Sequence, residues 1–128
     1  MNKSHKNAIL YCKREIEKNN FRCKREWDLS RGKFLNSVDL SCFRDDSGNN
    51  QKINAVGVEF ESTPKERWKS NKQILSNELD LKEFSRLYPR SKTWHLHVDE
   101  IEKIDFKKEL SVKKKSPLVK LSPWGFRI

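Results

Sequence analysis

The spacing of apolar residues divides the chain into a series of short elements joined by polar turns. Ile9, Cys12 and Ile16 recur at helical spacing and predict a helix over residues 6–19, which the pair Asn19 and Asn20 ends. Alternation of apolar and polar positions then predicts three strands, at residues 21–30, 34–43 and 53–62. The Asp-, Gly- and Asn-rich segment 44–52 predicts a hairpin between the second and third strands.

A helix start is predicted after the third strand. Thr63 has the residue type of an N-cap, Pro64 suits the first helical position, and Glu66 stands three residues past the cap. Apolar residues continue this helix toward Pro89, with a break expected near residues 77–80. A fourth strand is predicted over residues 92–98, and a short helix over residues 100–110.

These elements predict a small α/β (α+β) fold, in the order helix, strand, strand, strand, helix, strand, with helices flanking a mixed sheet. A chain of 128 residues suits one domain, with a core over about residues 6–99 and a basic C-terminal extension over about 100–128. The first residues are polar and contain lysine, and no apolar run is long enough for a signal peptide or membrane span. We therefore expect a cytoplasmic protein that binds no membrane.

The three cysteines, Cys12, Cys23 and Cys42, are odd in number and lack the spacing of a zinc motif. They also lie within apolar or mixed segments instead of loops. We therefore expect reduced, partly buried thiols and no disulfide framework.

The net charge of +10 is concentrated at the two ends of the chain. Residues 1–36 carry +6, residues 37–101 carry −1, and residues 102–128 carry +5. Because lysine and arginine release counterions from phosphates, a polyanion such as DNA is the expected partner of these flanks. The alternative is that the charge serves only solubility.

Two glutamates interrupt the apolar third strand. Because side chains alternate along a strand, Glu59 and Glu61 share a face with Gly57, and Asp39 on the preceding strand can reach the same place. Three hard oxygen ligands favour Mg²⁺ (or Mn²⁺) over zinc, and such an ion supports phosphodiester hydrolysis. The alternative is a polar strand face with no ligand.

The element order and these carboxylates resemble the PD-(D/E)xK nuclease superfamily, which includes many type II restriction enzymes and the archaeal Holliday-junction resolvases. The resemblance covers about residues 6–99 and implies a restriction endonuclease-like core, with Asp39 in the acidic position of the second strand and Glu59 opening the D/E-x-K triplet. Here Glu61 stands where the family carries lysine. Some restriction enzymes of the superfamily have the same E-x-E pattern, in which the second glutamate binds metal or acts as a general base.

The resemblance also directs attention to residues that could complete such a site. Many members supply a further glutamate from the first helix, and Glu15 is the nearest candidate here, with Glu17 and Glu26 as alternatives. The missing lysine could be supplied from the start of the second helix. Candidates for this role, and for contacts with nucleic acid, are Lys65, Lys69 and Lys72, for which the alternative is an ordinary exposed lysine.

Two other groups of residues have side chains that could bind a ligand. His95 and His97 share a strand face, but two histidines with no third ligand nearby favour a non-metal interpretation. In the tail, cations alternate with aromatic residues, which suits either phosphate and base contacts or packing on the core. The tail residues concerned are Lys113, Lys114, Lys115, Trp124, Phe126 and Arg127.

Together these features predict a magnesium-dependent endonuclease acting on duplex or branched DNA, with Asp39, Glu59, Glu61 and Glu15 as the candidate catalytic residues. The sequence also leaves open whether the chain forms a homodimer. Two alternatives from other classes are a non-catalytic nucleic-acid-binding protein that retains the fold, and a basic accessory subunit that binds an acidic protein.

Overall fold

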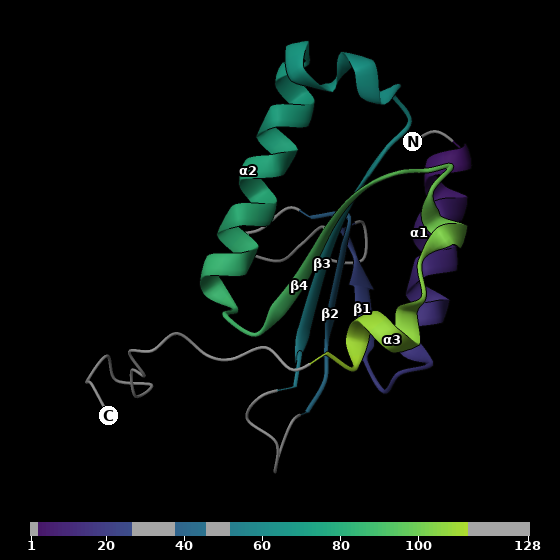
Figure 1. Cartoon of the computed structure of the whole chain (residues 1–128), viewed down its shortest axis with the longest axis vertical. Helices are drawn as coiled ribbons and strands as arrows, with labels where there is room; N and C mark the ends of the chain where they lie inside the picture. Colours follow the sequence, from purple (N-terminus) through teal and green to yellow (C-terminus); the bar gives the residue numbers. More distant parts are fainter. Residues whose placement is uncertain (1–2, 27–37, 46–51, 113–128) are drawn as a thin grey trace, which may run out of the picture.

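The computed structural model describes residues 3–26, 38–45 and 52–112, which form a four-stranded sheet with helices (Figure 1). The elements, in chain order, are α1 (Lys3–Glu17), β1 (Arg22–Arg25), β2 (Leu40–Phe43), β3 (Ala55–Glu61), the 3-10 helix η2 (Lys65–Ser70), α2 (Lys72–Leu87), β4 (Ser91–His97), the 3-10 helix η3 (Ile101–Lys103) and α3 (Phe106–Leu110). Within these described ranges, no helix is both long and apolar enough to cross a membrane.

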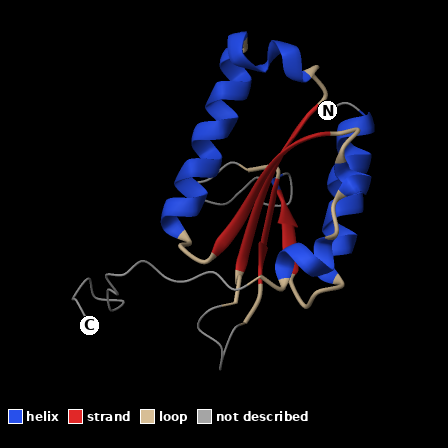
Figure 2. Ribbon diagram, in the orientation of Figure 1, coloured by secondary structure: helices blue, strands red, loops and turns tan. Residues whose placement is uncertain are grey.

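The strands lie in the order β1-β2-β3-β4. The first three are antiparallel neighbours, whereas β3 and β4 are parallel. Because parallel neighbours need a crossover connection, α2 links β3 to β4 and lies on one side of the sheet, while α1 lies on the other (Figure 2). The predicted mixed α/β class is confirmed, and so is the antiparallel pairing of the second and third strands.

The larger core lies between α1 and the sheet. Ile9, Cys12 and Ile16 are fully buried, as their helical spacing predicts. Every second residue of β3 packs against this side, namely Val56, Val58 and Phe60. After α1, Asn20 adopts a left-handed conformation with a φ of 68°, which asparagine tolerates, and the chain turns into β1.

A smaller cluster lies between α2 and the opposite side of the sheet, and it consists of Val38, Ala55, Leu81 and Phe84. The ring of Phe84 lies directly over Gly57 of β3. A Cβ atom on Gly57 would come within 2.8 Å of Cδ1 of this ring. The close approach of α2 to β3 therefore depends on the absence of a side chain at this position.

We expect Gly57→Ala to lower the free energy of unfolding by about 1–3 kcal/mol, because the new methyl group overlaps a buried ring. The double variant Gly57→Ala/Phe84→Leu should lose less than the sum of the two single variants, since leucine leaves room for the methyl group. Chemical denaturation of the three variants measures this coupling. Strictly additive losses would contradict the contact between Phe84 and Gly57.

The helix after β3 begins later than the sequence predicts. The carbonyl of Thr63 accepts a hydrogen bond from the indole Nε1 of Trp68 at 2.8 Å, and the chain first forms η2. The cap of α2 is instead Asn71, whose side chain accepts a bond from the amide of Ile74 at 3.1 Å. The predicted cap at Thr63 is therefore wrong. The predicted break near residues 77–80 is also wrong, because α2 is continuous there.

Cys23 and Cys42 form a disulfide between β1 and β2, which corrects the expectation of three reduced thiols. They are separated by 19 positions in the sequence, but the antiparallel register places them opposite each other with their Cα atoms 4.0 Å apart. Sequence spacing does not report such a register. Cys12 remains a free, buried thiol, and its burial raises the pKa to about 12, so it stays protonated.

The segment after β4 contains the two short helices η3 and α3, so the helix predicted over residues 100–110 forms as two pieces. Parts of four other predictions lie outside the described residues. They are the end of the first predicted strand, the start of the second, the turn at residues 44–52, and the basic tail at residues 113–128.

Candidate functional site

Two carboxylates lie where β2 and β3 separate. The paired register of these strands ends at Leu40 and Val58, and the next residues along, Asp39 and Glu59, join the strands through their side chains. The amide of Asp39 donates to Oε1 of Glu59 at 2.7 Å, and the amide of Phe60 donates to Oδ2 of Asp39 at 2.9 Å. These reciprocal bonds hold the two predicted metal ligands side by side.

Two further titratable residues reach Asp39. His5, in the first turn of α1, places Nε2 at 3.0 Å from Oδ2 of Asp39, and this hydrogen bond raises the pKa of His5. Glu26 follows β1, and its amide donates to the carbonyl of Asp39 at 3.0 Å. Burial, followed by repulsion from the Asp39 carboxylate, raises the pKa of the Glu26 carboxyl group.

Glu59 occupies the most buried position of this group and is only 2% exposed. Burial is the main reason that its pKa rises to about 9, and repulsion from Asp39, Glu26 and Asp80 adds to the increase. Asp80 belongs to α2, so the carboxyl groups come from both the sheet and the helix that covers it. Such a concentration of negative charge favours either a bound proton or a bound cation.

This pKa predicts how the stability of the metal-free protein depends on pH. The unfolded carboxyl group ionises near pH 4.5, whereas the folded one ionises near pH 9, so the folded state binds more protons between these values. The free energy of unfolding should therefore fall as the pH rises from about 5 to about 9 in EDTA. Denaturation of the parent and Glu59→Gln at both pH values measures this loss, and we expect it to be at least about 1 kcal/mol smaller in the variant. Equal losses would contradict the raised pKa.

Glu61 is held by a different set of residues. Both Nδ2 of Asn77 and Nε2 of His95 contact its Oε1, at 2.8 Å and 2.9 Å. The ring of Trp68 stacks on His95 with centroids 4.5 Å apart, and Oε1 of Glu78 lies 3.6 Å from the other ring nitrogen, Nδ1. Glu61 therefore lies on the α2 side of the sheet, as the alternation along β3 predicts, in a network from η2, α2 and β4.

The candidate lysines lie in η2 and at the first residue of α2. Lys65 of η2 forms an ion pair with Glu100 at 2.6 Å, and its Nζ lies 5.7 Å from the ring centre of Trp68. Lys69 and Lys72 are exposed. The lysines predicted to contact nucleic acid therefore surround η2, which directly follows the strand that carries Glu59 and Glu61. The other predicted contacts, Lys113, Lys114 and Lys115, lie outside the described residues.

Glu15 lies in a different part of α1 from the residue that contacts Asp39. It forms an ion pair with Lys18 at 2.6 Å. Ten residues separate it from His5, which corresponds to about 15 Å along the helix axis. Of the glutamates considered for this role, Glu26 is the one that the structure places beside Asp39.

Asp39 and Glu59 supply hard oxygen atoms, but each carboxylate already accepts a hydrogen bond from a backbone amide. Over residues 3–26, 38–45 and 52–112, no group of three or more His, Cys, Asp or Glu side chains has a geometry that could hold a metal ion. A divalent cation could bind here after Asp39 and Glu59 turn away from the amides of Phe60 and Asp39. Ion binding at this place therefore requires new side-chain rotamers.

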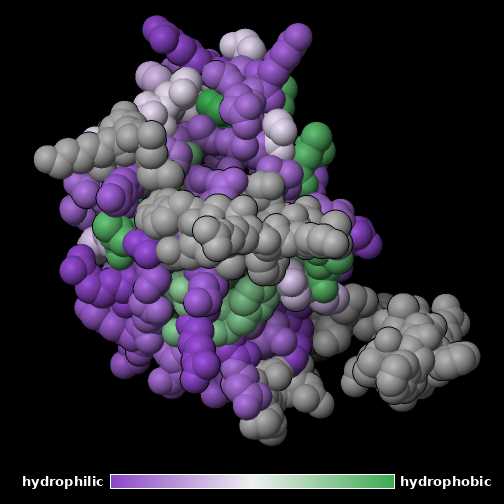
Figure 3. All heavy atoms as spheres, turned by 180° about the vertical axis from the view of Figure 1, so that it is seen from behind, coloured by the Kyte–Doolittle hydropathy of each residue, from purple (hydrophilic) through white to green (hydrophobic). Residues whose placement is uncertain are grey.

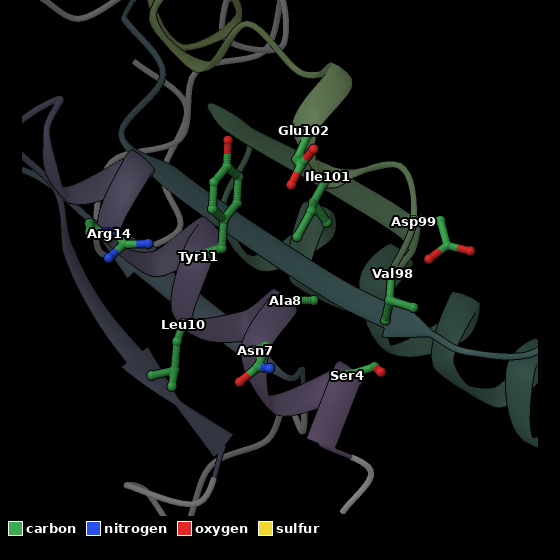
Figure 4. A pocket seen from close by; sticks show the side chains of 10 residues that line it. All are labelled: Ser4, Asn7, Ala8, Leu10, Tyr11, Arg14, Val98, Asp99, Ile101 and Glu102. Carbon is green, nitrogen blue, oxygen red and sulfur yellow. The ribbon is translucent and has the colours of Figure 1, made fainter.

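A groove of about 480 Å³ lies on the α1 side of the sheet, between α1 and the segment after β4 (Figure 4). Ala8, Val98 and Ile101 form its apolar part, while Tyr11 and Arg14 stand along its α1 wall. None of the residues that line it is a predicted site residue. The groove and the carboxylates are therefore separate features.

The described surface seen from behind is mostly hydrophilic, with small separate hydrophobic areas (Figure 3). Two exposed leucines of α2, Leu75 and Leu79, are 42% and 62% exposed. The polar character agrees with a high content of charged residues, 36% of the chain.

Comparisons with known proteins assign this chain to no family. Neither a scan against protein-family models nor searches of curated proteins and solved structures find a match to this chain. The case for a function therefore depends on the geometry of the site.

The sequence does not single out several partners of the carboxylates, because they come from other elements. Asn77 and Asp80 both lie on α2, and they precede the buried residues Leu81 and Phe84 by about one helical turn. This spacing places them on the face that covers the sheet, so helical phase is the signal that could have identified them. His5 offers no comparable signal, because its contact with Asp39 spans 34 positions.

Proposed function

We propose that this chain is a metal-dependent endonuclease that hydrolyses DNA phosphodiester bonds, with a core of the PD-(D/E)xK type. The observation that carries the proposal is the reciprocal pair of Asp39 and Glu59 at the point where β2 and β3 separate. The order of helices and strands supports it, because Glu59 lies on the third strand of a helix-strand-strand-strand-helix-strand arrangement and Asp39 directly precedes the second, β2, instead of lying on it as the sequence predicts.

The chemistry of the residues fits a hard divalent cation. Asp39 and Glu59 offer carboxylate oxygens, with Glu26 and Asp80 close by, and Mg²⁺ or Mn²⁺ prefers such ligands. Burial is the main cause of the raised pKa of Glu59, and repulsion from Asp39, Glu26 and Asp80 adds to it; a cation would relieve this repulsion. When bound, the ion would polarise the scissile phosphate and activate a water molecule.

The other residues have distinct roles in this proposal. Glu61 is the second ligand or the general base, because its Oε1 is already anchored and its second oxygen can serve water or the ion. Arg67, Lys69 and Lys72 are exposed at and after η2, where they can bind the phosphates that flank the scissile bond.

A second candidate function is non-catalytic binding of nucleic acid. One observation favours it: Asp39 and Glu59 are buried and already hydrogen-bonded to backbone amides, so they also serve to join β2 to β3. In this case the cations of η2 would still bind phosphates, but no hydrolysis would follow.

Nicking of supercoiled plasmid separates these functions. The parent protein is incubated with plasmid in Mg²⁺ or in EDTA, beside Asp39→Asn purified in the same way. The proposed nuclease nicks only in Mg²⁺, and only with Asp39 present. Plasmid that is shifted on a gel but never nicked would support the non-catalytic function. Protein that neither shifts nor nicks plasmid would contradict both, and would leave the basic accessory subunit.

A further inference from the structure

His95 and Glu61 form a close, largely enclosed pair. Nε2 of His95 lies 2.9 Å from Oε1 of Glu61, and the two side chains are 12% and 9% exposed. Trp68 covers one face of the imidazole, with an angle of 28° between the rings. The imidazole therefore has little freedom to rotate away from the carboxylate.

The geometry also defines the role of each atom in the pair. Because an ionised carboxylate only accepts hydrogen bonds, the 2.9 Å contact favours the tautomer in which Nε2 of His95 carries the hydrogen and donates a hydrogen bond to Oε1 of Glu61. The amide of Asn77 donates to the same oxygen at 2.8 Å. A carboxylate that receives two donors on one oxygen has a fixed orientation, and its second oxygen, Oε2, points in a defined direction.

We propose that His95 is a positioning residue, which holds Glu61 through Oε1 so that Oε2 is presented to the attacking water or to the ion. This inference rests on the proposed nuclease function. The pair lies in register with the site, because His95 is the β4 partner of Glu59 in the parallel pairing. His95 therefore lies next to Glu59 across the two strands, while its side chain contacts the carboxylate of Glu61.

His97 offers a matched comparison on the same strand. It stands two residues further along β4, where its Nδ1 accepts a hydrogen bond from the amide of Asp99 at 3.1 Å. Its side chain is 16% exposed, which is close to the value for His95. His97 is the β4 partner of Glu61 in the same parallel pairing, but its ring nitrogen is bonded to the amide of Asp99 and not to the Glu61 carboxylate. A change at His97 therefore perturbs β4 beside Glu61 without removing the contact of His95 with Oε1.

The first test compares turnover in plasmid nicking. His95→Phe keeps a ring against Trp68 but removes the donor, so kcat should fall about 10- to 100-fold, with KM and DNA affinity unchanged. His95→Gln restores a donor and should recover most of the activity, whereas His97→Gln should match the parent. In a Glu61→Gln background, His95→Phe should cause no further loss. Loss of activity that glutamine does not rescue, or that adds fully to Glu61→Gln, would overturn the proposal.

A second measurement distinguishes failure of this inference from failure of the nuclease function. Nitrogen-15 spectra of the imidazole identify the protonated ring nitrogen directly. Protonated Nε2, with a shift that changes in Glu61→Gln and not in His97→Gln, supports the anchor whether or not the parent nicks DNA. A parent without magnesium-dependent nicking would overturn the catalytic role together with the proposed function. A proton on Nδ1 alone would overturn the anchor itself.

Discussion

Replacing Glu59 with glutamine should lower magnesium-dependent plasmid nicking by at least about 100-fold, whereas affinity for DNA should be unchanged or higher. Glutamine keeps the size of the side chain, and its carbonyl oxygen can still accept the bond from the amide of Asp39. The negative charge that would hold the cation is lost. Without metal, the buried Glu59 has a pKa of about 9 and carries a proton near neutral pH, so its replacement by glutamine should not weaken DNA binding in EDTA.

The control for this variant is Glu102→Gln, which removes the same charge from an exposed residue of the groove on the α1 side. Nicking by this protein should equal that of the parent. Initial rates are measured at several Mg²⁺ concentrations, and affinity is measured by gel shift in EDTA. If Glu59→Gln and Glu102→Gln both nick as fast as the parent, Glu59 has no part in the chemistry.

Binding to plain duplex DNA should weaken steeply as salt increases. Each phosphate that a lysine or arginine neutralises contributes about 0.9 to the slope of log affinity against log salt. Six or more contacts would lower the affinity at least about 1,000-fold between 50 and 200 mM salt. The charges of +6 and +5 on the two flanks are sufficient for this number of contacts. An affinity that barely changes over this range would show that the cations do not meet phosphates.

A pair of triple variants tests whether the cations around η2 contribute to this slope. Changing Arg67, Lys69 and Lys72 to glutamine should lower the slope by about 2 to 3 units. The matched control changes three exposed cations of η3 and α3 to glutamine, namely Lys103, Lys107 and Lys108. These belong to the C-terminal flank and lie after β4. If the described part of the chain binds phosphates mainly at η2, their loss changes the slope less than loss of the η2 cations does. Equal changes in both triple variants would contradict a binding surface at η2.

The fold was largely predictable because its elements follow simple periods. The helical spacing of Ile9, Cys12 and Ile16 and the alternation along β3 each report which side is buried. Two features were not predictable from the sequence, because one depends on the register between strands and the other on which of two helix types forms after β3. Cys23 and Cys42 meet only through the pairing of β1 with β2. Thr63 does not cap a helix with its side chain, because the chain forms the 3-10 helix η2 after it, and the Thr63 carbonyl accepts a hydrogen bond from the indole of Trp68.

The candidate site was predictable only along its strands. Alternation placed Glu59 and Glu61 on the side of Gly57, and the hairpin placed Asp39 near them. Their remaining partners come from α1, β1, α2 and β4, and sequence spacing cannot combine so many elements. His95 illustrates the difficulty: the sequence shows a histidine on a half-polar strand, whereas in the structure its Nε2 lies 2.9 Å from Oε1 of Glu61.

The central claim is that Asp39 and Glu59 share one divalent cation, and titration calorimetry with Mn²⁺ in a metal-free buffer tests it most directly. The parent should bind one ion per chain at the pair, and Asp39→Asn should bind it much more weakly, because one hard ligand is lost. A parent that binds no ion, or an Asp39→Asn variant that binds Mn²⁺ as tightly as the parent, would contradict the claim.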